Sequence, residues 1–193
     1  MVVGMEIAGV VERVERIASV RANPAANTDL IQSGLVAVRE VQAWCDSQHA
    51  GLVAQLRQVD SFPEQAVAKA SKTSLGQAAK ATERSKTLEA TPNLADALDD
   101  GAITAHHVDA VTRASKKLDG AKRDELIERA DKLADVAKAG TVDEFARRLD
   151  LETKKRVHVC VRATTRRRER LRSVDARRTG VHGGPLIPGR LKC

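Results

Sequence analysis

The feature that most constrains this chain is a mainly apolar stripe with unbroken spacing between residues 28 and 59. Its members recur at alternating spacings of three and four residues, which places them on one face of an α-helix. This face, the 31–59 seam, runs through Ile31, Leu35, Val38, Gln42, Cys45, His49, Leu52, Leu56 and Val59. Asn27 or Thr28 can cap the helix. A seam this regular is expected to lie along a partner helix, in the same chain or in a second copy.

Two polar residues, Gln42 and His49, interrupt the seam. Lone polar residues in such a position set the register or lie at a half-exposed edge. Nothing near His49 completes a metal site, so a structural role is favoured for it. If a second copy supplies the partner helix, the expected contacts are Ile31, Leu35, Val38, Leu52 and Leu56.

Aromatic residues make up only 2% of the 193 residues, and tyrosine is absent. An all-β fold normally needs aromatic and β-branched strands, so it is nearly excluded. No stretch approaches the ~18 apolar residues of a membrane span. The three cysteines are far apart and odd in number, which favours a reducing cytoplasm over a disulfide framework or a zinc cluster.

Cap and turn signals divide the rest of the chain into shorter helices. The first carries Ile7, Val10, Val14 and Ile17 and ends around Asn23-Pro24. Two later helices are expected over residues 73–89 and 94–98, the second ending before Gly101. Three more are expected from their apolar faces: the first carries Val108, Val111 and Leu118, the second carries Leu126, Ala130, Leu133 and Ala137 and ends at Gly140, and the third carries Val142, Phe145 and Leu149. Two pairs, Ser61 with Glu64 and Thr141 with Glu144, predict capping boxes.

These signals predict an all-α, multi-helix bundle with long helices. The expected division is an N-terminal helix in residues 1–24, a helical core in 25–150, a basic helix in 151–176 and a disordered tail in 177–193. The alternation of Val157, Val159 and Val161 leaves a strand open as the alternative near the start of the basic helix. The tail holds four of the twelve glycines and two of the five prolines, with no helical period.

Charge is distributed unevenly along the chain. Residues 147–193 hold 15 lysines and arginines against four acidic residues, a net charge of +11, whereas residues 1–146 carry a net charge of −4. Such a basic segment attracts polyanions, or else serves as a solvated helix that keeps the protein apart from its copies. On a helix, its arginines form two rows that can straddle phosphates. The candidate nucleic-acid-binding residues are Arg162, Arg166, Arg167, Arg168, Arg170 and Arg172.

Motifs for catalysis are missing from the sequence. It holds no phosphate-binding glycine loop, no dinucleotide turn and no nucleophile elbow. His106 and His107 are adjacent, so their side chains diverge by about 100° on a helix and do not suit one metal ion. One of the two is expected to pack inward and the other to face water. Cys160 lacks a nearby general base, so we expect an inert thiol, no metal and no cofactor.

The segment TPNLADALDDGAITAHHVDAVTRA, residues 91–114, is the most characteristic part of a family resemblance. Together with the upstream SLGQAAKATERSKTLEA and the downstream RRRERLR, it resembles the actinobacterial thirteen-E-twelve repeat family, a helical domain of unknown function. The likeness covers most of residues 25–175. Within it, LADALDDGAITAHHVDAV is also similar to the helix-turn-helix segment of partition-type DNA-binding proteins.

The resemblance implies an all-helical domain that accompanies DNA cleavage, because that family usually precedes an HNH nuclease module. Such a module needs histidines and an asparagine, and often paired cysteines. Beyond residue 150 this chain has only His158 and His182, and no asparagine follows Asn93. We therefore expect a non-catalytic accessory domain with DNA as partner. The alternatives are an oligomerisation or docking module, and a truncated or frame-shifted remnant of an HNH endonuclease.

Overall fold

The computed structural model describes residues 7–152 and 154, and every regular element in that part of the chain is an α-helix. The predicted all-α, multi-helix fold is confirmed for these residues. The chain divides into two compact units, Met1–Leu151 and Glu152–Cys193, and nearly all described residues belong to the first. Beyond 154, the predicted basic helix and tail lie outside the described residues.

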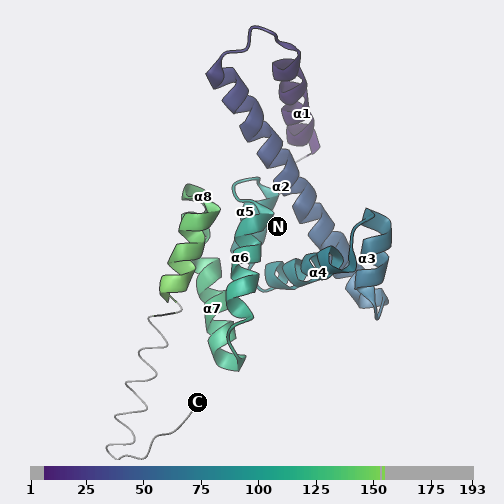
Figure 1. Ribbon diagram of the computed structural model, residues 1–193, viewed down its shortest axis with the longest axis vertical. Coiled ribbons are helices and arrows are strands. Elements are labelled where there is room, and N and C mark those ends of the chain that lie inside the picture. Colours follow the sequence, from purple (N-terminus) through teal and green to yellow (C-terminus); the bar gives the residue numbers. More distant parts are fainter. Residues whose placement is uncertain (1–6, 153, 155–193) are drawn as a thin grey trace, which may run out of the picture. The chain divides into compact units, whose positions relative to one another are not determined.

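Eight labelled helices follow one another along the first unit (Figure 1). Their bounds are α1 Ile7–Ala22, α2 Thr28–Val59, α3 Pro63–Ser71, α4 Leu75–Glu89, α5 Pro92–Asp99, α6 Ala105–Ser115, α7 Gly120–Lys132 and α8 Ala134–Ala139. A further helix begins at residue 142 and runs through residue 152, and we refer to it as the 142–152 helix.

Helices α1 and α2 form an antiparallel hairpin. Near one end, Val20 of α1 packs so closely on Gly34 that an added Cβ would lie 3.1 Å from Val20 Cγ1. Farther along, Arg13 Nε donates to Glu40 Oε2 over 2.6 Å. The two contacts run in opposite directions along the two helices, which defines the hairpin (Figure 1).

Helix α2 begins where the sequence predicts, with the Asn27 side chain accepting a hydrogen bond from the backbone of Leu30 over 2.9 Å. Its buried residues fall into two sets. Gly34 and Ala37 are buried in the half beside α1, whereas Ala43, Ala50 and Val53 are buried in the other half. With 3.6 residues per turn, these sets lie about half a turn apart around the helix. Helix α2 therefore turns one face to α1 and the opposite face to the remaining helices.

The 31–59 seam lies between these two buried faces. Ile31, Leu35 and Leu52 are 47%, 63% and 64% exposed. Val38 and Leu56 are half-buried. Leu56 packs against the small cluster that Val53, Val67 and Ala78 form on α2, α3 and α4. Within the described part of the chain, helices of the same chain therefore cover only one end of the seam. Contact with a second copy stays a prediction.

The main core gathers side chains from α2, α4 to α8 and the 142–152 helix. Its largest fully buried members are Phe145, Leu94, Leu98, Ile103, Leu149, Val108 and Val111. Among the described aromatic residues only Phe145 is buried; Phe62 is exposed and Trp44 half-buried. A second, smaller cluster joins α2, α3 and α4 through Val53, Val67 and Ala78.

Small and hydroxyl-bearing side chains bring α4 close to α2. The Ser85 hydroxyl donates to the Ala50 carbonyl of α2 over 3.0 Å. Within α4, the Thr82 hydroxyl donates to the Ala78 carbonyl over 3.2 Å. These buried hydroxyls are satisfied by backbone oxygens, which removes the cost of burying a polar group in the interface.

One of the two predicted capping boxes forms. Glu144 Oε2 accepts the Thr141 backbone N–H over 2.8 Å, as expected. The prediction of a capping box at Ser61 and Glu64 is wrong. Phe62 is the N-cap residue of α3 and makes no side-chain cap bond, and its backbone N–H donates to the Asp60 carboxylate. Because Pro63 occupies the first helical position, Ser61 lies one residue too early to cap.

The expected helix through Leu126 and Ala137 is interrupted in the structure. Leu133 leaves helical geometry, with φ −91° and ψ 11°, and separates α7 from α8. Leu126 and Ala130 before the break, and Ala134 and Ala137 after it, all join the core. Helical spacing alone indicates the buried face but does not reveal the break.

The turn between α5 and α6 requires glycine at position 101. Gly101 has φ +73°, and a Cβ there would lie 3.0 Å from both Cα and Cβ of Glu40 on α2. Any other side chain meets a left-handed backbone and a collision with a neighbouring helix at once. The turn thus lies directly against α2.

We predict that Gly101→Ala lowers the free energy of unfolding by about 2 kcal/mol or more, since strain and collision add. Gly51→Ala is the matched control: an added Cβ at Gly51, inside α2, meets no atom within 4 Å. That change is expected to stabilise the protein by about 0.5–1 kcal/mol. Urea unfolding followed by circular dichroism measures both, and equal effects would contradict this account.

Candidate nucleic-acid interface

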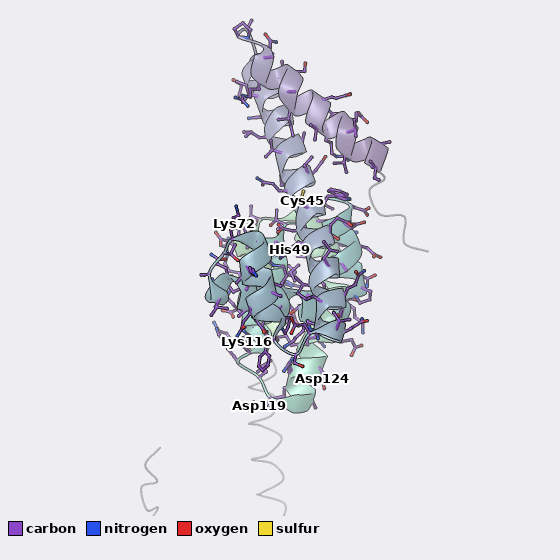
Figure 2. The ribbon with its side chains drawn as sticks, turned by 90° about the vertical axis from the view of Figure 1, so that its right-hand side faces the viewer. Cys45, His49, Lys72, Lys116, Asp119 and Asp124 are labelled. Carbon is purple, nitrogen blue, oxygen red and sulfur yellow. The ribbon has the colours of Figure 1, made fainter. Side chains whose placement is uncertain are left out.

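The six arginines predicted to bind nucleic acid, Arg162 to Arg172, lie outside the described residues. The described part of the chain offers a different basic surface, a cleft lined by α4, α6 and the 142–152 helix. It consists of two hollows that share Arg113 and Lys116. Figure 2 marks Lys116 well away from the α1–α2 hairpin. The ionisable residues that line the cleft are Lys80, Glu83, Arg84, His106, Asp109, Arg113, Lys116, Lys117, Asp143, Arg147 and Asp150.

An ion-paired network holds the wall between α4 and α6. Arg84 of α4 donates through Nε and Nη2 to the two carboxylate oxygens of Asp109 on α6, over 2.8 and 2.9 Å. Burial lowers the pKa of Arg84, but the bonds to Asp109 outweigh it and leave that pKa raised. A forked, partly buried pair of this kind fixes the orientation of two helices. Arg84 is therefore a structural element of the wall and not a free cation.

Glu83 is the second acidic residue of this wall. It accepts a hydrogen bond from Lys86 over 3.0 Å, and Nζ of Lys116, directly after α6, lies 3.4 Å from its other oxygen. The hydrogen bond from Lys86, with the charge of Lys116, holds the pKa of Glu83 below its usual value despite partial burial. The carboxylates of this wall, Glu83 and Asp109, are thus neutralised within the protein.

Among the described residues, four basic residues of the cleft have no carboxylate within ion-pair distance: Lys80, Arg113, Lys117 and Arg147. The charge of Arg147 still acts on Glu144, because it adds to the hydrogen bonds from Thr141 in lowering the pKa of that carboxyl group. All four are exposed. Arg113 Nε and Arg147 Nε each donate to a carbonyl of their own helix, at Asp109 over 3.3 Å and Asp143 over 3.2 Å. Those bonds leave the outer nitrogens of both guanidinium groups available to a ligand. Asp143 and Asp150 also line the cleft, so its six lysines and arginines exceed its four acidic residues by two. An exposed excess of positive charge suits an anionic ligand.

The two adjacent histidines behave as the sequence predicts. The His106 side chain is 80% exposed, whereas His107 is 5% exposed. His107 Nδ1 accepts the Thr104 backbone N–H over 3.2 Å and so caps α6. Its ring packs 5.7 Å, centre to centre, from that of Phe145 on the 142–152 helix. His107 therefore joins α6 to the 142–152 helix, two of the three helices that line the cleft.

His107 is held neutral by its surroundings. Burial lowers its pKa below the usual 6.5, and this outweighs the opposing hydrogen-bonding influence of the Gly140 and Thr104 backbones. His106 and Arg39 add smaller repulsions to a charged ring. A proton on Nδ1 would also destroy the bond that it accepts from Thr104.

In the part of the chain that the structure describes, no group of three or more histidine, cysteine or acidic side chains is placed to hold a metal ion. His49 Nε2 lies 3.4 Å from the Ser71 hydroxyl at a half-buried edge of α2, a position that fits a structural role. Cys45 is an exposed free thiol, and Cys160 lies outside the described residues. None of the described helices is long and apolar enough to cross a membrane.

The sequence analysis missed the cleft, because its cations come from three separate stretches of the chain. Only one local signal was present: Lys116 and Lys117 follow Arg113 by three and four residues, in the turn directly after α6. Lys80 and Arg147 join these residues through tertiary packing. Their neighbourhood follows from the Arg84–Asp109 and His107–Phe145 contacts.

Comparisons with protein-family models, with curated proteins and with solved structures give no match to this chain. The resemblance to the thirteen-E-twelve repeat family, carried by residues 91–114, stays a prediction.

The burial of His107 predicts a pH-dependent stability. Because its pKa is lower in the folded state, the folded protein binds fewer protons than the unfolded chain around pH 6. The stability that His107 contributes is complete above about pH 6.5 and is lost as the pH falls toward the folded-state pKa. Unfolding measured in urea between about pH 5 and 7.5 reports this loss.

His107→Gln removes the titration and keeps a side-chain oxygen that can accept the Thr104 N–H. We expect the variant to be about 1 kcal/mol less stable at neutral pH and to have a flatter pH profile than the parent. His106→Gln, the adjacent and exposed control, should leave the profile unchanged. If the stability of His107→Gln changed with pH as steeply as that of the parent, a group other than His107 would be responsible for the pH dependence.

Proposed function

We propose that this chain is a non-catalytic helical domain that binds the phosphate backbone of nucleic acid. The contacts would come from the cleft between α4, α6 and the 142–152 helix, and from the arginines of the segment that follows. The observation that carries the proposal is the excess of exposed positive charge in the cleft, where Lys80, Arg113, Lys117 and Arg147 have no described carboxylate within ion-pair distance. The accessory role also rests on the resemblance to a family that accompanies HNH nucleases.

Position along the chain supports the same reading. The 142–152 helix contributes Arg147 to the cleft and leads into the segment that gives residues 147–193 their net charge of +11. Each phosphate neutralised by a lysine or arginine releases condensed counterions, so a surface of this kind gains affinity from several weak contacts together.

The composition of the cleft favours backbone contacts over base reading. None of its lining residues is a tryptophan, tyrosine or phenylalanine. Single-stranded nucleic acid is usually held by aromatic side chains that stack on bases, and such a platform is missing from this cleft. Duplex DNA, bound through phosphates with little sequence preference, is therefore the proposed ligand.

The test is the binding of a labelled duplex of about 25 base pairs to the full chain, titrated with salt from about 50 to 300 mM. We expect affinity to fall steeply, with a log–log slope of several units, as several phosphates are neutralised. Failure to bind at about 50 mM salt would overturn the proposal and leave the docking or remnant alternatives.

Two sets of variants assign the contacts. Arg113→Ala with Lys117→Ala should reduce the salt slope by about two, one for each lost phosphate contact. Replacing Arg166, Arg167, Arg168 and Arg170 by glutamate should abolish binding with the mass unchanged. Lys69→Ala with Lys122→Ala removes the same charge from exposed positions on α3 and α7 outside the cleft and should leave the slope as it is. Equal losses in the cleft and control pairs would contradict a localised interface.

A further inference from the structure

A third hollow adjoins the basic cleft, between α2, α3 and α4, and we refer to it as the α3 hollow (Figure 2, where His49 and Lys72 are labelled). It shares three residues of α4 with the cleft: Gln77, Lys80 and Arg84. These residues are three and four positions apart, so they form one row along the helix. One row of α4 side chains therefore lines both the cleft and the α3 hollow.

The turn between α3 and α4 builds the rim of the α3 hollow. Helix α3 ends at Lys72, whose backbone is left-handed, with φ 53° and ψ 41°. The Thr73 N–H donates to the Ala68 carbonyl over 3.0 Å and closes the turn. Ser71 and Thr73, which flank Lys72 in the chain, both line the hollow. Their positions are therefore fixed by a closed helix end.

His49 connects this rim to α2. Its Nε2 lies 3.4 Å from the Ser71 hydroxyl, a long contact that joins α2 to the end of α3. A hydrogen bond of this length is weak, so the hydroxyl can turn to another acceptor while the imidazole still limits where Ser71 lies. His49, a polar member of the 31–59 seam, thus has its partner in the same chain.

Three side chains of the α3 hollow have donor groups that no described residue uses. The Thr73 hydroxyl, the Gln77 amide and the Lys80 ammonium group form no hydrogen bond or ion pair in the part of the chain that the structure describes. All three side chains are exposed. Together with the Ser71 hydroxyl, they offer N–H and O–H groups to one ligand.

The charge of the lining favours an anion. Asp46 is the single acidic residue among those that line the α3 hollow, and its Oδ1 lies 3.5 Å from Nη1 of Arg84. Lys80 and Arg84 exceed Asp46 by one positive charge. Arg84 already faces two carboxylates, those of Asp46 and Asp109, so Lys80 supplies the charge that an anion would meet.

We propose that the α3 hollow binds a phosphate group. Lys80 supplies the charge, and Ser71, Thr73 and Gln77 supply hydrogen bonds. His49 is a positioning residue that holds Ser71. Phosphate oxygens accept hydrogen bonds from serine, threonine and glutamine side chains as well as from lysine. No tryptophan, tyrosine or phenylalanine lines the hollow, so it offers nothing on which an attached base could stack.

The phosphate can come from two sources. One is the backbone of the duplex that we propose for the cleft, and this source rests on the proposed function. Because Lys80 lines both depressions, a strand held in the cleft would pass close to the α3 hollow. The other source is free inorganic phosphate or a small phosphate ester, which does not depend on the cleft.

The first test titrates the full chain with inorganic phosphate to about 50 mM at constant ionic strength and follows the backbone amide signals by NMR. We expect saturable shifts at residues 73–77, with a dissociation constant of about 10 mM. Thr73→Val with Gln77→Ala should weaken this binding about threefold to tenfold, because two hydrogen bonds are lost. Thr28→Val with Gln32→Ala is the matched control: it removes the same groups from exposed positions near the start of α2 and should leave the binding unchanged.

The second test measures duplex binding by the same variants as the salt concentration is varied. Thr73 and Gln77 are uncharged, so their loss should lower the affinity about threefold to tenfold at every salt concentration and leave the log–log slope unchanged. Lys80→Ala, in contrast, should lower the slope by about one. The control pair on α2 should change neither the affinity nor the slope.

The two tests together identify the source of the phosphate. A loss of duplex affinity in Thr73→Val with Gln77→Ala assigns a backbone phosphate to the α3 hollow, and a loss of phosphate binding alone assigns free phosphate. The proposal is overturned if inorganic phosphate gives no saturable shift and this pair leaves the duplex affinity at the parental value. If the parent does not bind the duplex at all, the proposed function fails, and the phosphate titration alone decides whether the hollow is a site.

Discussion

Glu40 is the residue of α2 at which α1 and the α5–α6 turn both make contact. Its backbone receives the α5–α6 turn, where a Cβ on Gly101 would come within 3.0 Å of its Cα. Its carboxylate accepts a hydrogen bond from Arg13 of α1 over 2.6 Å. Helix α1 and the α5–α6 turn therefore contact α2 at the same level from different sides. Helix α6 begins directly after this turn, so the position of the cleft depends on the same contact.

Acidic residues inside the first unit explain why some of its cations remain available to a ligand. Asp109 binds Arg84, and Glu83 binds Lys86 and Lys116, so these carboxylates hold helices together. Lys80, Lys117 and the outer nitrogens of Arg113 and Arg147 are left over at the cleft.

The sequence predicts much of the helical architecture, because caps and left-handed turns are local signals. Asn27 at the start of α2, Gly101 after α5 and the Thr141–Glu144 box all form as expected. The 31–59 seam shows the limit of periodicity: it identifies an apolar face but not whether a helix covers it. The covered faces of α2 consist of Gly34, Ala37, Ala43, Ala50 and Val53, mostly small residues with weak apolar signals that allow close helix approach. The cleft depends on packing between distant segments, and no local pattern reveals it. The arginines at 162–172 were found from local spacing, and their role stays a prediction.

Hydrogen exchange of the full chain, with and without a duplex of about 25 base pairs at low salt, tests the central claim most directly. Binding at the cleft predicts slower exchange in peptides from α6 and the 142–152 helix, and unchanged exchange in peptides from α1. Unchanged exchange in α6 and the 142–152 helix at a saturating duplex concentration would contradict the proposed interface, as would protection confined to the α1–α2 hairpin.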